Sequence, residues 1–154
     1  MKKIILLLCL ASLNTFAESS PNPTTIQHPN CKILFWATIP YRDETSRILL
    51  QVGDRILKEK GYTTVRPSSH TGLCAVARNR LEAHTNWNWL DDDNLRLTAQ
   101  VKRVDYDLFC NKKETILGQA EVEEFVRTEE DPSEDQIALF QIAYNQLPNC
   151  RVKK

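Results

Sequence analysis

The residues best suited to nucleophilic chemistry stand together at Ser68-Ser69-His70, with two further histidines at His28 and His84. Nucleophilic catalysis needs a Ser or Cys, a His and an orienting acid that meet in space. Neighbours in sequence rarely point at one another, and no Gly-x-Ser-x-Gly elbow is present. The histidines also lack the His-x-x-x-His spacing of a helical metal pair, and His28 is expected to be solvated in a loose segment. The sequence therefore predicts no catalytic residue, no metal site and no cofactor.

Carboxylates offer a second kind of chemistry. The run Asp91-Asp92-Asp93-Asn94 has the oxygen ligands that calcium prefers, but the EF-hand pattern of alternating ligands, Gly and Glu is absent. It is expected to be a solvated acidic loop that caps the next strand. Hydrolysis of sugars would need two carboxylates at a set separation, which a sequence does not give. A small secreted hydrolase using a carboxylate pair remains an alternative.

Three tryptophans are candidates for binding a partner. Trp87 and Trp89 flank Asn88 in a segment, Thr85–Asn94, that is expected to be an irregular loop. Exposed tryptophans are enriched where partners dock. Trp36 is expected on a face of the sheet that helices leave open. In the alternative reading, Trp87 and Trp89 fold back and seal the edge of the core.

Four cysteines, an even number, follow the apolar start: Cys31, Cys74, Cys110 and Cys150. In an exported chain this pattern predicts two disulfides, and three connectivities are possible. The absence of Cys-x-x-Cys argues against a zinc knuckle or a thioredoxin-type site. If the turn of the predicted hairpin and the end of the last helix lie at the same end of the domain, the pairs are Cys110–Cys150 and Cys31–Cys74.

The start of the chain predicts export. Met1–Ala17 has two lysines, a short apolar run and small residues at Thr15 and Ala17, as a secretory signal peptide does. Glu18–Asn30 is rich in Pro, Ser and Thr and is expected to be a flexible leader. Without the two signal lysines, 18 basic residues face 20 acidic ones, so no pull toward nucleic acid is expected. No later segment is apolar enough to be an integral membrane span.

Residues 31–154 are expected to form a single domain. Local patterns predict the elements of its first half. Lys32–Ile39 is expected to be a central strand, because both of its faces are largely apolar. Glu44–Lys60 has an apolar stripe at helical spacing and Gly61 at its end. Tyr62–Val65 is then a second strand, parallel to the first. Leu73–His84 fits either a helix or a strand, and a short helix is favoured.

The second half is dominated by a long antiparallel hairpin over Leu95–Arg127, in which apolar and polar residues alternate. The residues expected to point inward, its inward phase, change from odd positions up to Val101 to the even positions Val104, Tyr106 and Leu108. A bulge is therefore expected near Lys102–Arg103. Lys102 and Arg103 are expected to pair with Glu121 and Glu123. Ser133-Glu-Asp-Gln136 matches a capping box and begins the last helix. The fold class is α+β, a two-layer sandwich with helices on one face of a small mixed sheet.

The stretch Ile48–Val65, a helix ending in Lys-Gly-Tyr before a β-branched strand, resembles small α+β domains of bacterial envelope proteins, such as the amino-terminal domain of the Tol-system translocation protein. The resemblance implies an accessory role and assigns no functional residue. The missing catalytic constellation and the disulfide-braced scaffold favour, as the first hypothesis, an exported, non-enzymatic module, periplasmic or secreted. It would dock a protein partner through the open sheet face and the loop of Trp87 and Trp89. An inhibitor of a secreted enzyme, using the loop Arg66–Gly72, is a further alternative.

Overall fold

The computed structural model of the protein describes residues 24–36, 44–66, 79–126 and 133–154. The predicted signal peptide, most of the leader, Ser68 to His70 and Cys74 lie outside these residues. The loop Arg66–Gly72 is described only at Arg66. No helix among the described residues is long and apolar enough to span a membrane.

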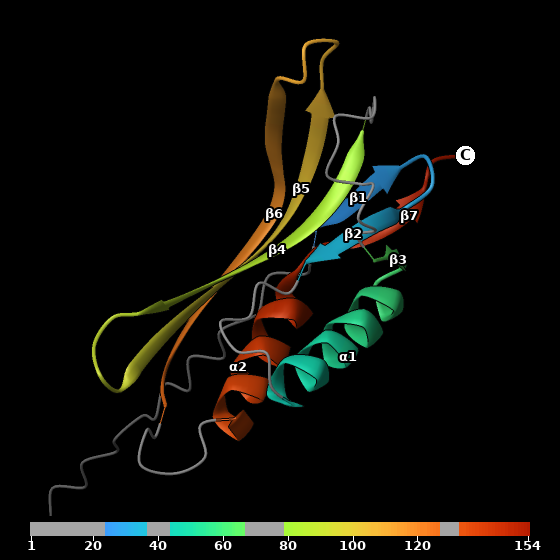
Figure 1. Cartoon of the computed structure of the whole chain (residues 1–154). Coiled ribbons are helices and arrows are strands. Elements are labelled where there is room, and N and C mark those ends of the chain that lie inside the picture. The colour runs from blue at the N-terminus through green and yellow to red at the C-terminus, as the bar shows by residue number, and fades with distance from the viewer. Residues whose placement is uncertain (1–23, 37–43, 67–78, 127–132) are drawn as a thin grey trace, which may run out of the picture.

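The main sheet has five strands in the order β3-β2-β4-β5-β6. The strand β2 (Lys32–Trp36) and the helix α1 (Glu44–Glu59) lie where the local patterns predict them, and β3 (Thr63–Val65) runs parallel to β2. Both helices lie on one side of the twisted sheet, and the β5–β6 hairpin extends beyond them (Figure 1). The predicted α+β class is confirmed.

The central strand β4 (Arg80–Trp89) overturns two predictions, the short helix over Leu73–His84 and the loop over Thr85–Asn94. Residues 73–78 lie outside the described part of the chain. From Arg80 onward the chain pairs with β2 in parallel and with β5 in antiparallel fashion. These two neighbours complete its backbone hydrogen bonds, so tertiary pairing decides a segment whose local pattern is ambiguous.

The hairpin of β5 (Asn94–Tyr106) and β6 (Lys112–Phe125) confirms the alternation read from the sequence. The register between the strands shifts at Val101/Lys102, where a bulge is predicted. The unpaired residue is Leu117 of β6, and pairing of β4 with β5 continues without a shift. Val104 is fully buried, as predicted, although it stays on the face of Lys102 and outside the core cluster under the helices. Leu108 is 83% exposed, so the predicted inward phase does not continue to the turn.

The core lies between the sheet and the helices α1 and α2 (Ser133–Gln146). Leu81, Ala83, Leu97, Ala99 and Val101 cover the inner face of the sheet and are fully buried. Phe140 of α2 stacks on Tyr144, with ring centroids 4.0 Å apart, and Phe35 meets Tyr144 edge-on at 5.7 Å. The buried Tyr144 hydroxyl is 2.7 Å from the Oγ1 atom of Thr85, so β4 and α2 share a hydrogen bond inside the core.

A second, two-stranded parallel sheet joins β1 (Thr25–His28) to β7 (Asn149–Val152). The sequence predicts a flexible leader at the position of β1 and no strand after the last helix. Gly61 permits the close approach of β7, because its φ of 88° is left-handed and a Cβ atom there would collide with the carbonyl oxygen of Cys150. Tyr62 donates to the carbonyl of Pro148 at 2.9 Å.

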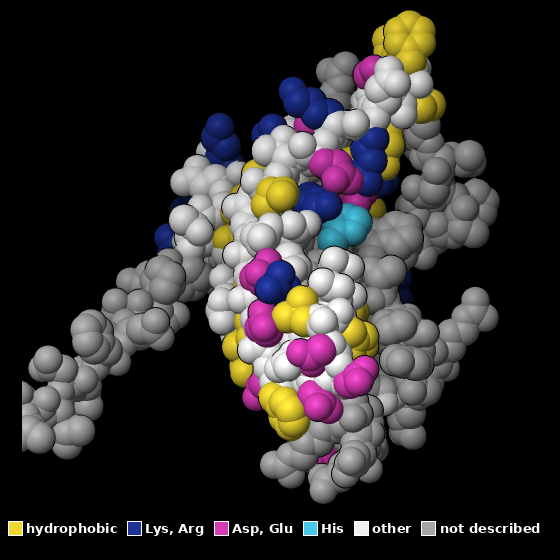
Figure 2. Space-filling model, turned by 90° about the vertical axis from the view of Figure 1, so that its left-hand side faces the viewer, with side chains coloured by type: hydrophobic (Ala, Val, Ile, Leu, Met, Phe, Trp, Pro, Cys, Tyr) yellow, Lys and Arg dark blue, Asp and Glu magenta, His cyan; other side chains and the backbone are white. Residues whose placement is uncertain are grey.

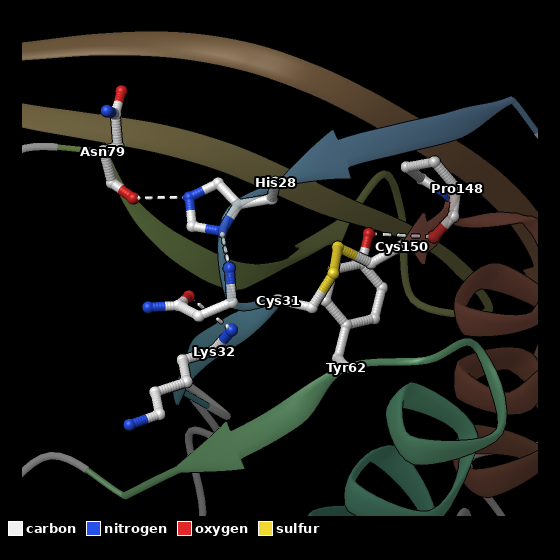
Figure 3. The surroundings of a disulfide bond; sticks show 8 residues. His28, Cys31, Lys32, Tyr62, Asn79, Pro148 and Cys150 are labelled. Carbon is white, nitrogen blue, oxygen red and sulfur yellow. Dashed lines mark hydrogen bonds between the residues drawn. A yellow bond between two sulfur atoms is a disulfide. The ribbon is translucent and has the colours of Figure 1, made fainter. Parts of the chain in front are cut away.

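Cys31 and Cys150 form the disulfide that braces this region (Figure 3). The expected pairs Cys110–Cys150 and Cys31–Cys74 are therefore wrong. This is the one complete disulfide among the described residues, where two were expected; Cys110 is also disulfide-bonded, and its partner lies outside them. The prediction failed because β7 turns back beside β1 and β2, which brings Cys150 to the start of β2 and away from the hairpin turn.

Candidate functional site

The face of the main sheet that points away from the helices, here called the open face, is the candidate site. Directly opposed residues of an antiparallel pair share a face, so the register places Glu82 beside Lys102, His84 beside Gln100, and Asn88 beside Arg96. On the next strand, Arg96 is opposite Glu123 and Gln100 is opposite Gln119. Acidic and basic side chains interleave over this surface, with a histidine among them (Figure 2).

The Glu82 carboxylate is the centre of an ion cluster on β4. Its Oε1 accepts from Arg80 Nε at 2.7 Å, and its Oε2 lies 2.8 Å from His84 Nε2. Arg80 also donates to the Tyr106 hydroxyl at 3.2 Å. Burial disfavours the charged carboxylate, but the hydrogen bonds from His84 and Arg80 outweigh it and hold the pKa of Glu82 below its ordinary value. Both carboxylate oxygens are occupied by their own neighbours, which makes this cluster a brace of the sheet.

Polar pairs continue across β5 and β6. Arg96 contacts Glu123 at 3.0 Å and Glu121 at 3.5 Å. Lys102 pairs with Glu114 at 3.2 Å, and the amides of Gln100 and Gln119 bond to each other. The predicted pairs of Lys102 and Arg103 with Glu121 and Glu123 are thus wrong; Arg103 pairs with Asp105. The register places Glu123 opposite Arg96 and Glu121 opposite Thr98, out of reach of Lys102, whereas Glu114 is diagonal to Lys102 beyond the bulge.

Accessibility differs along the open face. Leu34 and Glu82 are buried there, at 6% and 2% exposure. Asn86, Asn88 and Gln119 are exposed, and the side chains of Glu121 and Glu123 are each 48% exposed. The accessible part of the open face therefore covers β5, β6 and the last half of β4. It is mainly polar, although Ile116, which is opposite Lys102 and 53% exposed, also lies on it. Cross-strand pairs hold the side chains of Arg96, Gln100 and Lys102 on β5 against β6.

The three tryptophans do not share one surface. Trp36 is paired with His84 in the register of β2 and β4, and its side chain lies outside the description. Trp87 is on β4, not in a loop, and its ring stacks on Phe140 with centroids 6.3 Å apart. Its buried indole N–H has no partner among the described residues. Trp89 ends β4 and is 40% exposed.

The acidic run forms the turn between β4 and β5, as the capping interpretation expects. Asp91 Oδ1 accepts the backbone N–H groups of Asp93 at 2.9 Å and Asn94 at 2.7 Å. Hydrogen bonds from the Asn94 side chain, followed by these backbone groups, lower the pKa of Asp91. The Asp91 carboxylate thus accepts hydrogen bonds from its own turn. Within the described ranges, no group of His, Cys, Asp or Glu is arranged to hold a metal ion.

His28 differs from the expectation of a solvated histidine. His28 is 7% exposed, its Nε2 lies 2.7 Å from the carbonyl oxygen of Asn79, and its Nδ1 accepts weakly from the N–H of Asn30 at 3.5 Å (Figure 3). It joins β1 to the chain just before β4. No signal in the sequence distinguishes it from a solvated residue, because Asn79 is 51 positions away.

One hollow of about 590 Å³ lies at the turn of the hairpin, where its described lining comes from residues 105–109 and 111–113. Neither Glu82 nor His84 lines it. Tyr106, which accepts a hydrogen bond from Arg80, is the residue through which the hollow borders the ion cluster.

Comparisons with known proteins identify no family for the chain. No family model matches it, and no curated protein does. A solved structure that is similar to it is a dodecamer of a PelC variant from Paraburkholderia phytofirmans, with 12% sequence identity and a TM-score of 0.43 over 84% of this chain and 93% of that one. Similarity at this level transfers neither the function nor the assembly of PelC to this chain.

Proposed function

We propose that the protein is an exported, non-enzymatic binding or accessory module that docks a protein partner through the accessible part of the open face. The observation that carries this proposal is the fixed row of polar side chains over β5 and β6, on the side of the sheet opposite both helices. Such a surface is stable in water and needs no reorganisation before it meets a partner.

Charge arrangement supports docking by a polar partner surface. Arg96 lies between Glu121 and Glu123, and Lys102 lies beside Glu114, so positive and negative groups alternate over a short distance. Alternating charges give specificity and register more than raw affinity, because a wrongly placed partner meets like charges. Trp89 is 40% exposed at the end of β4, but it is opposite the buried Leu95 and so lies on the helix-facing side of the sheet. It would add an aromatic anchor for a partner that also reaches round the turn between β4 and β5.

Export is supported by the cysteines. The Cys31–Cys150 bond joins segments 119 residues apart, and such structural disulfides persist in oxidising compartments such as the periplasm or the extracellular space. The apolar start of the chain, Met1–Ala17, is of the kind that directs a protein there. A periplasmic or secreted location is part of the proposal.

The experiment compares two double variants with the same change of charge. Gln100→Lys with Gln119→Lys alters the open face, whereas Gln51→Lys with Gln146→Lys alters exposed positions on α1 and α2. Both are used to capture partners from the envelope fraction of the producing cells. A partner that the helix variant retains and the open-face variant loses at least tenfold supports the proposal; equal capture by both folded variants contradicts it.

A small hydrolase is tested separately with a broad panel of ester, peptide and glycoside substrates. Turnover of one substrate class by the purified protein, abolished by a single Asp→Asn or Glu→Gln substitution, would replace the binding proposal.

A further inference from the structure

The turn between β5 and β6, here called the tip (Asp107–Lys113), exposes two large apolar side chains. Leu108 is 83% exposed and Phe109 is 86% exposed. The turn is held in shape: Asp107 Oδ1 accepts the N–H groups of Phe109 and Asn111, each at 2.8 Å, and Cys110 is disulfide-bonded. Because the turn is already ordered, burying these side chains costs little conformational entropy.

The opposite end of the same sheet also exposes apolar side chains. Leu90 is 39% exposed and Phe125 is 58% exposed. Leu90 donates its N–H to the carbonyl of Asn94 at 2.9 Å, and Asn94 is paired with Phe125 across β5 and β6. The two apolar side chains therefore flank Asn94, about two strand spacings or 10 Å apart.

Acidic residues surround Leu90 and Phe125, and this surface is here called the acidic end. It carries six acidic residues, with Arg96 as the cation paired among them: Asp91, Asp92, Asp93, Glu121, Glu123 and Glu124. The tip has the opposite sign, since it carries Asp107 with Lys112 and Lys113. Acidic side chains gather at the lower end of the molecule, and basic ones are more frequent toward the upper end, which hydrophobic side chains cap (Figure 2).

We propose that the protein associates head to tail with a second copy of itself, the tip of one copy docking on the acidic end of the next. Leu108 and Phe109 would pack against Leu90 and Phe125. Lys113 would face Asp92 and Glu124; none of these three has an ion-pair partner among the described residues. Apolar contact supplies the attraction, and opposite charge fixes which ends meet.

A lipid surface fits the tip less well than a second copy does. Lys112 is paired with Glu114, and Asp107 adds a negative charge within the turn. Only Lys113 is then left to attract an anionic membrane, and one lysine gives a weak attraction. The acidic end, by contrast, offers both an apolar contact and the complementary charge.

The contact is heterologous, because two different surfaces of the chain meet. Each copy keeps one unused tip and one unused acidic end, so association continues into a chain or a closed ring. Since only a few side chains are buried, a single contact is smaller than a standard stable interface. Association is therefore expected to depend strongly on concentration and to weaken with salt.

Complementation between two variants tests the proposal. Leu108→Ser with Phe109→Ser removes the tip contact, and Leu90→Ser with Phe125→Ser removes the acidic-end contact. In sedimentation velocity over a hundredfold range of concentration, the exported wild-type chain should grow in mass and each variant alone should stay monomeric. An equimolar mixture of the two variants should stop at the dimer, since each copy retains one working end.

Ile142→Ser is the control, because Ile142 is an exposed apolar residue of α2 away from both ends, at 43% exposure. It should associate as the wild type does, as should the Gln100→Lys with Gln119→Lys variant, which separates this inference from the proposed function. A wild-type chain that stays monomeric throughout would overturn the inference. Monomers that cosediment with anionic phosphatidylglycerol vesicles, and lose that binding in the tip variant, would overturn it in favour of a lipid surface.

Discussion

Cys31, at the start of β2, is bonded to Cys150 of β7 with 5.9 Å between their Cα atoms. The bond joins the main sheet to the two-stranded sheet of β1 and β7. It therefore fixes the last strand of the chain to the edge of the core, near the ring of Tyr62 (Figure 3).

Replacing both cysteines by Ala should lower the free energy of unfolding by about 2–4 kcal/mol, because the bond closes a long loop in the unfolded chain. Urea unfolding of the double variant measures this loss. Hydrogen exchange should show the largest loss of protection in β1 and β7, next to the missing bond. Unchanged protection there would contradict the assigned brace.

Stability should fall with acid as Glu82 becomes protonated. The native environment lowers the pKa of this carboxyl below 4.5. Its contribution is thus fully present above pH 4.5 and is lost as the pH drops through the lower native value. Glu82→Gln should destabilise the protein by about 1–3 kcal/mol at pH 7. The difference from the wild type should shrink as the pH falls below 4.5 in chemical denaturation.

The hydrogen bond between Thr85 and Tyr144 should show coupling in a double-mutant cycle. Tyr144→Phe leaves the buried Thr85 hydroxyl without this partner and should cost about 1–2 kcal/mol. Thr85→Val removes the other group. The double variant should cost less than the sum of the two single losses. Strict additivity would mean that the bond contributes nothing to the native state.

Substitution of Trp87 should affect stability as a core residue does, and substitution of Trp89 as a surface residue does. Trp87→Ala removes the ring that stacks on Phe140 and should destabilise the fold by about 3 kcal/mol. Trp89→Ala should change stability by less than about 1 kcal/mol, because the side chain is largely in solvent. If Trp89 anchors a partner, this variant should capture less of it while unfolding at the same denaturant concentration as the wild type.

Local patterns predict those elements whose partners are close in sequence. The β5–β6 hairpin, α1 and α2 all follow from alternation or from helical periodicity within a single segment. β4 is missed because its ambiguous pattern is decided by β2 and β5, one of which lies more than forty residues away. β1 and β7 are missed because strands this short form only by pairing with each other. That pairing, which places Ile26 beside Cys150, cannot be read from either segment alone.

The candidate site follows the same rule. The open face is expected from a sheet covered on one side, but its ion cluster is not, since Arg80, Glu82 and His84 lie in a segment expected to be helical. On a helix Glu82 would point away from the face shared by Arg80 and His84, whereas on a strand all three residues share one face. Because a helix was expected in place of β4, the ion cluster around Glu82 could not be predicted.

Photo-crosslinking in the producing cells shows whether the open face contacts a protein partner. A photoreactive amino acid is placed at Gln119 on the open face or at Gln51 on α1, and the adducts with other proteins are compared after illumination. If the open face docks a partner, position 119 should give a discrete adduct with a protein partner and position 51 should give none. A discrete partner adduct from position 51 alone, or from neither position in folded and exported protein, would contradict such docking.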